Sequence, residues 1–413
     1  MRLRPYQQES VEFLAGRRHA LLAHEMRLGK TSCAIVAAHK ANASTVLVTC
    51  PAIAVPHWHR EFERWWPSGP LPRLKIMSYD RARTWWKDGL SGTVDLFIPD
   101  EAHFAKNPEA ARTQMVYGKG GFAWRAGATW ALSGTPAPKH AGELWPLLRA
   151  FGAVGMGYGD FCDRYCTWDA THTKITGTRA AYIPELREIL SRVMLRRMRK
   201  EVAPELEDID FQFLEVEPQP VDFRVPADLT DDRLAEWLED NERVDHDDRV
   251  AVAMAKAKAL VPHIEFAIGN GLLRQTVVFG WHKEPLEKLA TALGAADIPS
   301  AVINGETSAR KREFHQEEFR SGVVKALCVN IATAGTAIDL SSADHGYFLE
   351  LDWVPGNNVQ AANRLISLQK QSKVSIDVVT WRGSTDDRVQ KVLLRRVKEL
   401  ATLFANNKGA TDK

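Results

Sequence analysis

The chain has 413 residues, 45% of them hydrophobic, which is enough length and apolar content for two domains with separate cores. Lys and Arg total 54 and Asp and Glu total 52, so the net charge of +2 does not by itself indicate a nucleic-acid surface. Five cysteines, an odd number, argue against a disulfide framework, and no run of roughly 20 apolar residues predicts a membrane span, so we expect a soluble intracellular protein.

Short apolar runs alternate with helical stretches through the first 150 residues. The runs TVLVTC (45–50) and VDLFIP (94–99) have the length and composition of buried strands. The stretches at 7–16 and 57–66 have helical character. This alternation predicts a parallel sheet with flanking helices, and we place the first domain at residues 1–150.

The pattern changes after residue 150. A glycine-rich stretch and a polar stretch lead to ELREILSRVMLRRMRKEV (185–202), which has the pattern of one basic amphipathic helix, and an acidic stretch with several prolines follows at 217–248. We therefore expect a helical insertion and linker at 151–250. Strands then alternate with helices from QTVVFGW (275–281) to VSIDVVTW (374–381), which predicts a second α/β domain at 251–405 and a flexible tail at 406–413.

A phosphate-binding loop is indicated near the N-terminus. HEMRLGKT (24–31) lies between the apolar ALLA (20–23) and a helix-compatible stretch, and this order of strand, loop and helix presents backbone N–H groups to phosphates. Lys30 would reach the β- and γ-phosphates of ATP, and Thr31 would bind Mg²⁺. Gly-Lys-Thr alone often only begins a surface helix, so the inference needs a second motif.

DLFIPDEAH (95–103) supplies that second motif. Its apolar strand delivers Asp100 and Glu101 at the carboxyl end, where open α/β sheets bind ligands. Asp100 would bind Mg²⁺ through its water shell, and Glu101 would orient or deprotonate the attacking water. Two adjacent carboxylates after a strand are usually a solvated turn, but together with the upstream loop they predict an ATP-hydrolysing site.

Four motifs in this order resemble motifs I, II, III and VI of superfamily 2 helicases: HEMRLGKT, PDEAH, ALSGTP and VQAANRL. More narrowly, the chain resembles the Swi/Snf-type DNA translocases, whose further blocks are similar to LRPYQQESVEFL, CPAIAVPHWHREFERW, IMSYD, MLRRMRKEV and INGETSARKREFHQEEF. The match covers nearly the whole chain. The resemblance implies two RecA-like parallel-sheet domains in tandem that form an ATP cleft, in a compact motor similar to phage or bacterial members.

The resemblance also implies roles for individual residues. Nucleotide contacts fall on Gln7, Gly29, Lys30, Thr31, Gly335, Asp339 and Gln360, and we add Arg27, which departs from the family pattern. Hydrolysis falls on Lys30, Asp100, Glu101, His103 and, as an arginine finger, Arg364. DNA contact or coupling falls on His57, Trp58, Arg60, Ser133, Thr135, Arg196 and Arg197. Taken alone, the Ser-Gly-Thr-Pro segment is a plausible simple turn, Asp339 a helix cap, and the basic stretch a solvated helix face.

Two positions depart from the family pattern. Arg27 stands where the family has the first glycine of its loop, and Ser367 stands where it has a second arginine. We expect the backbone at Arg27 to avoid a left-handed conformation, which is uncommon for arginine. We also expect Arg27 to lie over the cleft and partly replace the charge missing at position 367. The simpler alternative is that Arg27 points to solvent and that Ser367 packs locally.

The expected function is that of an ATP-driven translocase on double-stranded DNA, including branched or forked DNA, in replication, recombination or repair. Contacts to phosphates suit a motor that steps over any base. We expect a monomeric motor in the cytoplasm of a bacterium or a phage-infected cell, with no sustained strand separation. The alternative is an ATP-binding DNA clamp or partner-recruiting module that has lost hydrolysis, and DNA-stimulated phosphate release distinguishes the two.

Overall fold

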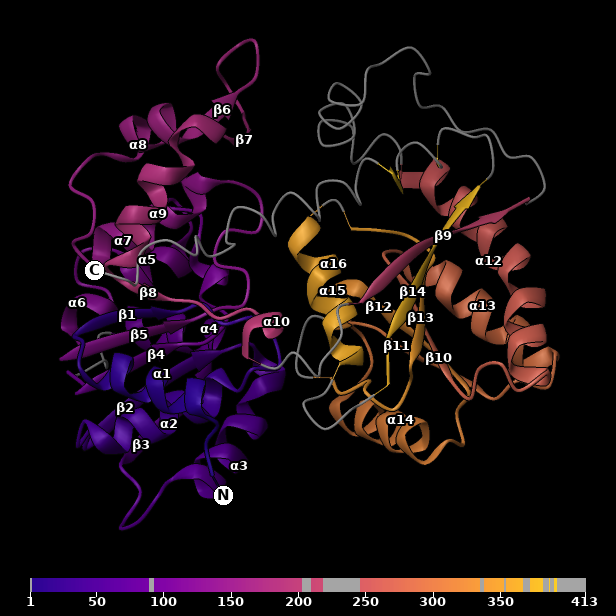
Figure 1. The fold of residues 1–413 in the computed structure, drawn as a ribbon, viewed down its shortest axis with the longest axis horizontal. Coiled ribbons are helices and arrows are strands. Elements are labelled where there is room, and N and C mark those ends of the chain that lie inside the picture. The colour runs from indigo at the N-terminus through magenta and orange to yellow at the C-terminus, as the bar shows by residue number, and fades with distance from the viewer. Residues whose placement is uncertain are drawn as a thin grey trace. The chain divides into compact units, whose positions relative to one another are not determined.

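The computed structural model describes residues 2–88, 93–202, 209–217, 246–334, 338–352, 354–366 and 372–381, with Asp386, Gln390 and Lys391. These residues form two compact units, the first comprising the described residues up to Val202 and the second those from Ile209 onward. Each unit is built around its own parallel sheet (Figure 1). No helix in the described ranges is both long enough and apolar enough to cross a membrane.

The first sheet has the strand order β3-β2-β4-β5-β1-β8, and all neighbouring strands are parallel. Its strands are β1 (His19–Leu22), β2 (Thr45–Cys50), β3 (Arg73–Ser78), β4 (Leu96–Pro99), β5 (Ala128–Leu132) and β8 (Met194–Leu195). The helices are α1 (Pro5–Ala15), α2 (Lys30–Lys40), α3 (Val55–Trp65), α4 (Tyr79–Lys87), α5 (Ala111–Tyr117), α6 (Phe122–Arg125), α7 (Trp145–Ala150), α8 (Tyr158–Tyr165), α9 (Ile183–Ser191) and α10 (Arg199–Val202). Parallel neighbours require crossover connections, which explains why helices alternate with strands from β1 to β5.

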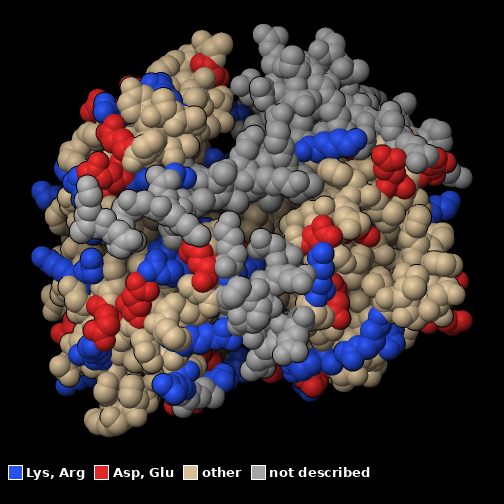
Figure 2. Space-filling view, in the orientation of Figure 1, with Lys and Arg blue, Asp and Glu red and all other residues tan. Residues whose placement is uncertain are grey.

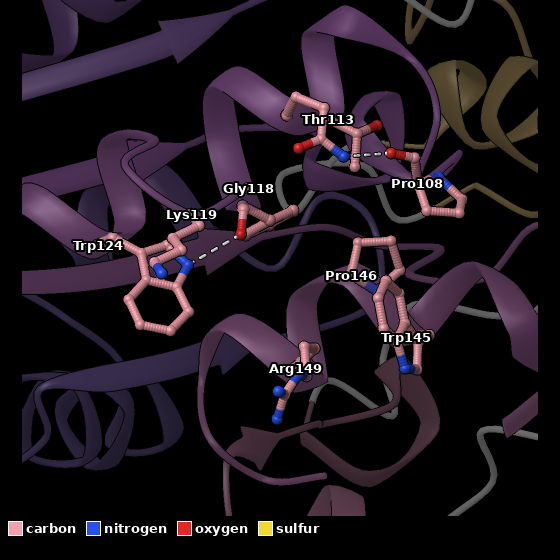
Figure 3. A pocket seen from close by; sticks show the side chains of 10 residues that line it. Pro108, Thr113, Gly118, Lys119, Trp124, Trp145, Pro146 and Arg149 are labelled. Carbon is pink, nitrogen blue, oxygen red and sulfur yellow. Dashed lines mark hydrogen bonds between the residues drawn. The ribbon is translucent and has the colours of Figure 1, made fainter. Parts of the chain in front are cut away.

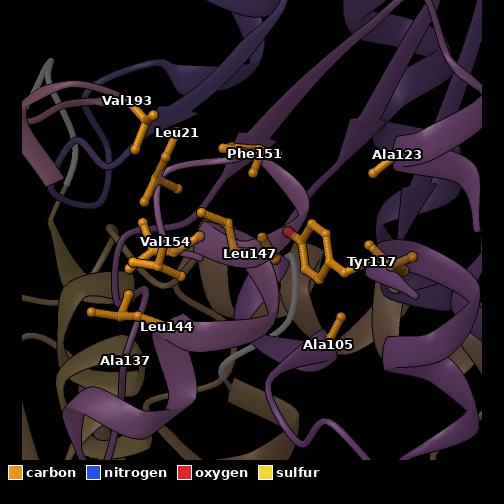
Figure 4. Close-up of a cluster of buried hydrophobic side chains, with 14 of the residues drawn as sticks. Leu21, Ala105, Tyr117, Ala123, Ala137, Leu144, Leu147, Phe151, Val154 and Val193 are labelled. Carbon is orange, nitrogen blue, oxygen red and sulfur yellow. The ribbon is translucent and has the colours of Figure 1, made fainter. Parts of the chain in front are cut away.

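Apolar side chains alternate between the two faces of the first sheet, so each face has its own core. Leu21 of β1 belongs to the core formed with α5 and α7 to α9, whereas Ala20 and Leu22 belong to the core formed with α1, α2 and α3. Figure 4 shows the first of these cores, where the rings of Tyr117 and Phe151 meet with centroids 6.3 Å apart. Helices on both faces bury the sheet, as a parallel sheet requires.

The segment expected as an insertion contains packed structure. The antiparallel hairpin of β6 (Cys166–Trp168) and β7 (Ile175–Thr178) lies between α8 and α9 in sequence. Phe161 and Tyr165 of α8 and Leu186 and Leu190 of α9 are buried in the core of the first unit. This packing attaches both helices to the first unit.

The basic stretch at 185–202 is not one helix, which corrects our expectation. Helix α9 ends first, β8 then extends the sheet edge beside β1, and α10 follows. Beyond β1, the backbone N–H groups of Ala23 and Glu25 donate to the carbonyls of Leu195 and Arg197 at 2.9 and 3.0 Å. Pairing with the free edge of β1 outweighs the local helix preference, because each paired residue satisfies backbone groups that the edge would otherwise expose.

The second sheet has the strand order β11-β12-β10-β13-β14-β9, again with parallel neighbours. Its strands are β9 (Asp210–Val216), β10 (Thr276–Gly280), β11 (Ser300–Ile303), β12 (Ala326–Asn330), β13 (His345–Phe348) and β14 (Ser375–Trp381). The helices are α12 (His246–Gly269), α13 (Lys283–Ala295), α14 (Ala309–Ser321), α15 (Ile331–Ala334) and α16 (Pro355–Ala362). Helices α12 and α13 cover one face of this sheet, and α15 and α16 cover the other (Figure 1).

The two tandem parallel sheets confirm the predicted fold class. The predicted strand at 45–50 has the observed bounds of β2, and the second-domain strands also form where expected. Strand β9 was missed, although the apolar residues that alternate in DFQFLEV are a strand signal. Figure 2 shows basic and acidic side chains interspersed over the visible face of the first unit, as the balanced composition suggests.

Candidate nucleotide-binding site

The residues between β1 and α2 form the predicted loop. Helix α2 begins at Lys30, so its unpaired N-terminal N–H groups lie at the carboxyl edge of the sheet. Gly29 is left-handed, with φ 73°, and a Cβ atom there would lie 2.4 Å from Nε2 of Gln7. The backbone therefore favours glycine at this position, and any Cβ atom would displace the Gln7 amide.

Gln7 of α1 supports this loop. Its side-chain oxygen accepts a hydrogen bond from the Arg4 N–H at 2.9 Å, and its Nε2 donates to the Leu28 carbonyl at 3.3 Å. The Tyr6 hydroxyl donates to the same carbonyl at 3.1 Å. Gln7 is 6% exposed, so its amide is fixed beside the loop backbone. The adenine contact of Gln7 stays a prediction.

Arg27 adopts a left-handed conformation, with φ 66°, which corrects our expectation for this backbone. A left-handed residue that has a Cβ atom costs about 1–2 kcal/mol relative to the right-handed form. The loop therefore keeps the conformation that a glycine would favour while it carries an arginine. His57 of α3 has an exposed side chain, yet partial shielding of its ring from water lowers its pKa; Glu61 and Asp100 oppose this shift, and Arg60 and Arg27 add to it.

Lys30 is directed over the loop. Its ammonium donates to the carbonyls of His24 and Glu25, at 2.9 and 3.4 Å. His24 is fully buried and its Nε2 lies 2.6 Å from the Ser10 hydroxyl of α1. Burial, with Lys30 nearby, lowers the pKa of His24 to about 3, so the ring is neutral and acts as an anchor for the loop.

The acidic motif follows β4 at the same edge of the sheet. Asp100 Oδ2 accepts a hydrogen bond from the indole N–H of Trp58 at 2.8 Å, and Oδ1 accepts one from the backbone N–H of Glu101 at 3.0 Å. The Tyr79 hydroxyl donates to the Asp100 carbonyl at 2.7 Å. Burial and the neighbouring Glu101 raise the pKa of Asp100 to about 6. The repulsion between these neighbouring carboxylates would be relieved by a cation bound beside them.

Glu101 and His103 lie in a strained turn. Glu101 has φ 50°, and the short helix η2 (Ala102–Ala105) follows it. Left-handed residues that have a Cβ atom are often found at functional sites, where the surrounding structure maintains them. His103 Nδ1 lies 3.4 Å from Glu101 Oε2 and 3.1 Å from the Ser133 hydroxyl. Burial lowers the pKa of His103 to about 3, so these are contacts of a neutral ring.

Ser133 and Thr135 connect the two motifs, because β5 lies between β4 and β1 in the sheet. The Ser133 hydroxyl contacts His103 and accepts the backbone N–H of Thr135 at 3.2 Å. A Cβ atom at Gly134 would lie 3.5 Å from Nζ of Lys30, so this turn approaches the loop from the other side. The turn therefore touches both the acidic motif and the loop lysine.

The arginines that follow β8 contact the protein itself. Arg196 is 7% exposed, and its Nη1 donates to the carbonyls of Ala23 and Gly134 at 2.9 and 3.3 Å. Burial lowers the pKa of Arg196 to about 10. The guanidinium is enclosed between the loop and the Ser-Gly-Thr turn, where it bonds to both, and its predicted role in DNA contact or coupling stays a prediction.

The neighbouring arginines are also paired. Arg197 Nη2 lies 2.5 Å from the Glu9 carboxylate of α1, with a side chain that is 27% exposed. Arg199 forms a buried ion pair with Glu25 of the loop at 3.2 Å. The side chain of Lys200 lies outside the described part of the structure. DNA contact by Arg197 stays a prediction.

Helix α3 divides the other DNA candidates into two groups. His57 and Arg60 are exposed, so both remain available for contact with phosphates. Trp58 is 0% exposed and donates to Asp100, so its side chain faces the acidic motif, and its predicted role in DNA contact or coupling stays a prediction. Successive residues of a helix point in directions about 100° apart, which explains how neighbours face solvent and core.

The second unit holds the remaining predicted residues. Arg364 lies in the short helix η5 (Asn363–Leu365), and its Nε donates to the Ala334 carbonyl at 3.1 Å. Asp339 is exposed, and its carboxylate accepts the Ser341 N–H at 3.2 Å in a local turn. Gln360 of α16 is 5% exposed. Gly335 and Ser367 lie outside the described residues.

A separate cavity of about 250 Å³ lies among α5, α6 and α7 (Figure 3). It is lined by Pro108, Thr113, Gln114, Tyr117, Gly118, Lys119, Trp124, Trp145, Pro146 and Arg149, none of which was predicted as a site residue. Trp124 lies just before β5, and Phe151, just after α7, stacks on His19, the first residue of β1. The lining residue Trp124 thus precedes β5, whereas the loop and the acidic motif follow β1 and β4.

Comparison with known families agrees with the order of the motifs. Residues 6–94 and 76–225 match the family described as SNF2-related domain, and residues 256–369 match the Helicase conserved C-terminal domain. The first family by itself accounts for more than half of the chain. The chain belongs to the SNF2 family of helicase superfamily 2. This is a family of DNA-dependent ATPases.

Curated relatives of this SNF2-family chain are longer proteins. It is 27% identical over 423 residues to the SWI/SNF-related matrix-associated actin-dependent regulator of chromatin subfamily A-like protein 1 of Xenopus tropicalis, covering 96% of this chain and 44% of that protein. It is 25% identical over 448 residues to the DNA annealing helicase and endonuclease ZRANB3 of Mus musculus, covering 96% and 40%. The chain thus spans less than half the length of either relative.

A solved structure shares the fold of this SNF2-family chain. The Hef helicase domain of Pyrococcus furiosus superposes with a TM-score of 0.53 at 12% sequence identity, covering 94% of this chain and 97% of that one. At this identity the likeness concerns the fold alone.

Sequence reasoning missed several residues that build the SNF2-family site. His24 and Tyr79 lie inside quoted motifs, but no local pattern indicated that one anchors the loop and the other holds the Asp100 carbonyl. Glu25 and Arg199 are 174 positions apart and meet only because β8 pairs with β1. Co-variation of these two charged positions in an alignment of homologous sequences could have suggested this contact, whereas a single sequence carries no such signal.

Proposed function

We propose that this chain is an ATP-driven translocase on double-stranded DNA that remodels branched or forked DNA and favours annealing over sustained strand separation. The observation that carries the proposal is the convergence of the loop lysine, the acidic pair and the Ser-Gly-Thr turn at the carboxyl ends of β1, β4 and β5. The name of the mouse relative, a DNA annealing helicase, supports the annealing part.

The first unit supplies the groups that ATP hydrolysis requires. The N-terminus of α2 and the ammonium of Lys30 would bind the phosphates, and Lys30 would exchange its carbonyl partners in the loop for phosphate oxygens. Thr31 and Asp100 offer the hard oxygen donors that suit Mg²⁺. Bound there, Mg²⁺ would neutralise charge on the phosphates.

Glu101 is the group that would orient or deprotonate the attacking water. The neutral His103 lies between Glu101 and Ser133 and would link the state of the carboxylate to the turn at 133–135. Because the turn at 133–135 also approaches Lys30, a change in the phosphates bound by Lys30 would affect both the loop and the acidic motif. Arg364 as an arginine finger, and the nucleotide contacts of Gly335, Asp339 and Gln360, are carried over from the family resemblance.

DNA contact in the first unit is assigned to the outer face of α3. His57 and Arg60 are exposed there, and an arginine directed at phosphates binds any sequence. Such contacts are salt-dependent, because each neutralised phosphate releases counterions. Removal of Arg60 is therefore expected to reduce the slope of affinity against salt concentration.

Phosphate release with and without duplex DNA tests the proposal. We expect stimulation by DNA, and Lys30→Ala should abolish turnover because it removes the ammonium that would bind the β- and γ-phosphates. Lys40→Ala is the matched control, since Lys40 ends the helix that Lys30 begins and pairs with Glu12 on the surface. Tight ATP binding by the parent chain without turnover would instead support the hydrolysis-deficient clamp.

The annealing part needs its own assay. A forked substrate with a displaced complementary strand should be rewound in an ATP-dependent manner, and a blunt duplex should stay paired. Robust processive unwinding of the blunt duplex would overturn this part while leaving DNA-stimulated hydrolysis intact.

A further inference from the structure

We propose that Trp58 is a positioning residue: it orients the Asp100 carboxylate and transmits to it the position of α3. The inference rests on the proposed function, because it presumes that Asp100 serves the metal and that the outer face of α3 contacts DNA. It adds a physical link between metal binding at Asp100 and DNA contact at α3. Trp58 itself touches neither nucleotide nor duplex in this scheme.

The Asp100 carboxylate is held by two donors of different kinds. One is the backbone N–H of the next residue, Glu101, which is fixed by the chain itself. The other is the indole N–H of Trp58, at 2.8 Å, from a helix 42 residues earlier in the sequence. An indole nitrogen is a donor only, so the contact always orients an acceptor oxygen. Among the described residues, Trp58 is the one side chain that donates to this carboxylate.

Other contacts fix the backbone of Asp100 and leave the carboxylate to Trp58. The Asp100 N–H donates to the Thr49 carbonyl of β2 at 2.8 Å, and its carbonyl accepts the Tyr79 hydroxyl. With the main chain held from β2 and α4, a shift of α3 would alter mainly the direction of the carboxylate oxygens. The geometry of oxygen ligands around a metal such as Mg²⁺ is narrowly defined, so a small rotation matters.

Trp58 moves with α3 as a body. The helix has 11 residues, and its buried side carries Trp58 and Phe62, with ring centroids 6.0 Å apart; Phe62 also meets Trp66, just past the helix, at 6.1 Å. His57 precedes Trp58 directly and Arg60 follows by two positions, and both are exposed. A duplex that binds His57 and Arg60 would therefore displace the turn of α3 that carries Trp58, whose indole N–H holds the Asp100 carboxylate.

The competing explanation is that Trp58 only fills the core. Trp130 of β5 provides the matched comparison, because it is 1% exposed and donates its indole N–H to the Arg17 carbonyl at 2.9 Å. Trp130→Phe and Trp58→Phe each remove one buried indole hydrogen bond and keep an aromatic ring. Only the second substitution removes a contact with Asp100.

The experiment compares the full-length parent, Trp58→Phe and Trp130→Phe by two measurements. Calorimetric titration with ADP, in EDTA and in MgCl₂, gives the gain in affinity that Mg²⁺ provides. Phosphate release at saturating ATP, with and without saturating duplex, gives the factor of stimulation. We expect Trp58→Phe to bind ADP in EDTA as the parent does and to lose at least about tenfold of the Mg²⁺-dependent gain, the lower end of the effect of one hydrogen bond to a charged group. It should also lose most of the stimulation by DNA.

Trp130→Phe should behave as the parent in both measurements. Equal Mg²⁺ gains in the two variants would overturn the positioning role, and a reduced gain with full DNA stimulation would overturn the transmission from α3. A parent chain without any Mg²⁺ gain would refute the metal site of the proposed function and this inference with it. If Trp58→Phe folds poorly, 3-benzothienylalanine at position 58 keeps the shape of the indole and removes only the N–H, and the same outcomes apply.

Discussion

Substitution of Gly29 by alanine should destabilise the first unit for two separable reasons. The left-handed backbone, with φ 73°, costs about 1–2 kcal/mol once a Cβ atom is present. The Cβ atom would also lie 2.4 Å from Nε2 of Gln7 and displace that amide. Its two hydrogen bonds, with Arg4 and Leu28, are worth about 0.5–1.5 kcal/mol each.

The expected loss for Gly29→Ala is about 2–4 kcal/mol, after a gain of about 0.4–1 kcal/mol from the stiffer unfolded chain. Gly152→Ala is the control, because Gly152 has φ 70° and a Cβ atom added there would meet nothing within 4 Å. The difference between the two variants isolates the displacement of Gln7. It should be about 1–3 kcal/mol, the worth of the two lost hydrogen bonds.

Urea unfolding of the full chain, followed by tryptophan fluorescence, measures both variants. Of the 13 tryptophans, nine lie at or before residue 168, so the signal reports mainly on the first unit. Nucleotide affinity should fall for Gly29→Ala and stay unchanged for Gly152→Ala. Equal destabilisation by the two substitutions would refute the argument, since it would mean that Gln7 does not restrict position 29.

The other predictions concern the loop, the buried arginine and the acidic pair. Arg27→Gly should change the free energy of unfolding by no more than about 1 kcal/mol, because relief of the left-handed strain offsets the greater freedom of glycine in the unfolded chain. A loss above about 2 kcal/mol in urea unfolding would contradict this prediction. If Arg27 compensates for Ser367, Arg27→Gly should slow DNA-stimulated hydrolysis in the parent but little in Ser367→Arg, and additive effects on the rate would rule that out. Arg196→Ala should lower the free energy of unfolding by about 2–4 kcal/mol, because the carbonyls of Ala23 and Gly134 lose this donor. The dependence of DNA affinity on salt concentration should not change. A changed salt dependence at parental stability would support DNA contact by Arg196. Burial and Glu101 raise the pKa of Asp100 to about 6, so the rate of hydrolysis should fall as the pH drops through about 6. The contribution of the Asp100 carboxyl group to folding stability follows the opposite direction and is lost as the pH rises through about 6. A pH–rate profile that is flat down to about pH 5 would exclude the assignment.

The sequence by itself determined the local elements and the motifs at their ends. Strand β2 has the bounds that its apolar run predicts, and Lys30 begins α2 as the order of strand, loop and helix requires. Asp100 follows β4 in the same way. These features depend on residues within about ten positions of one another, where hydrophobic periodicity and turn chemistry act directly.

Only the tertiary structure decided which polar side chains face inwards. Trp58 and Arg196 lie in stretches whose patterns suit a surface helix, yet their acceptors are Asp100 and Ala23, which are 42 and 173 positions away. The stretch before Arg196 forms strand β8 and not a helix, because it pairs with the edge of β1. Arg27 has a left-handed backbone because the surrounding loop holds it in that conformation. In each case the energy of a contact between distant segments exceeds a local preference of about 1 kcal/mol, and a single sequence shows only the local preference.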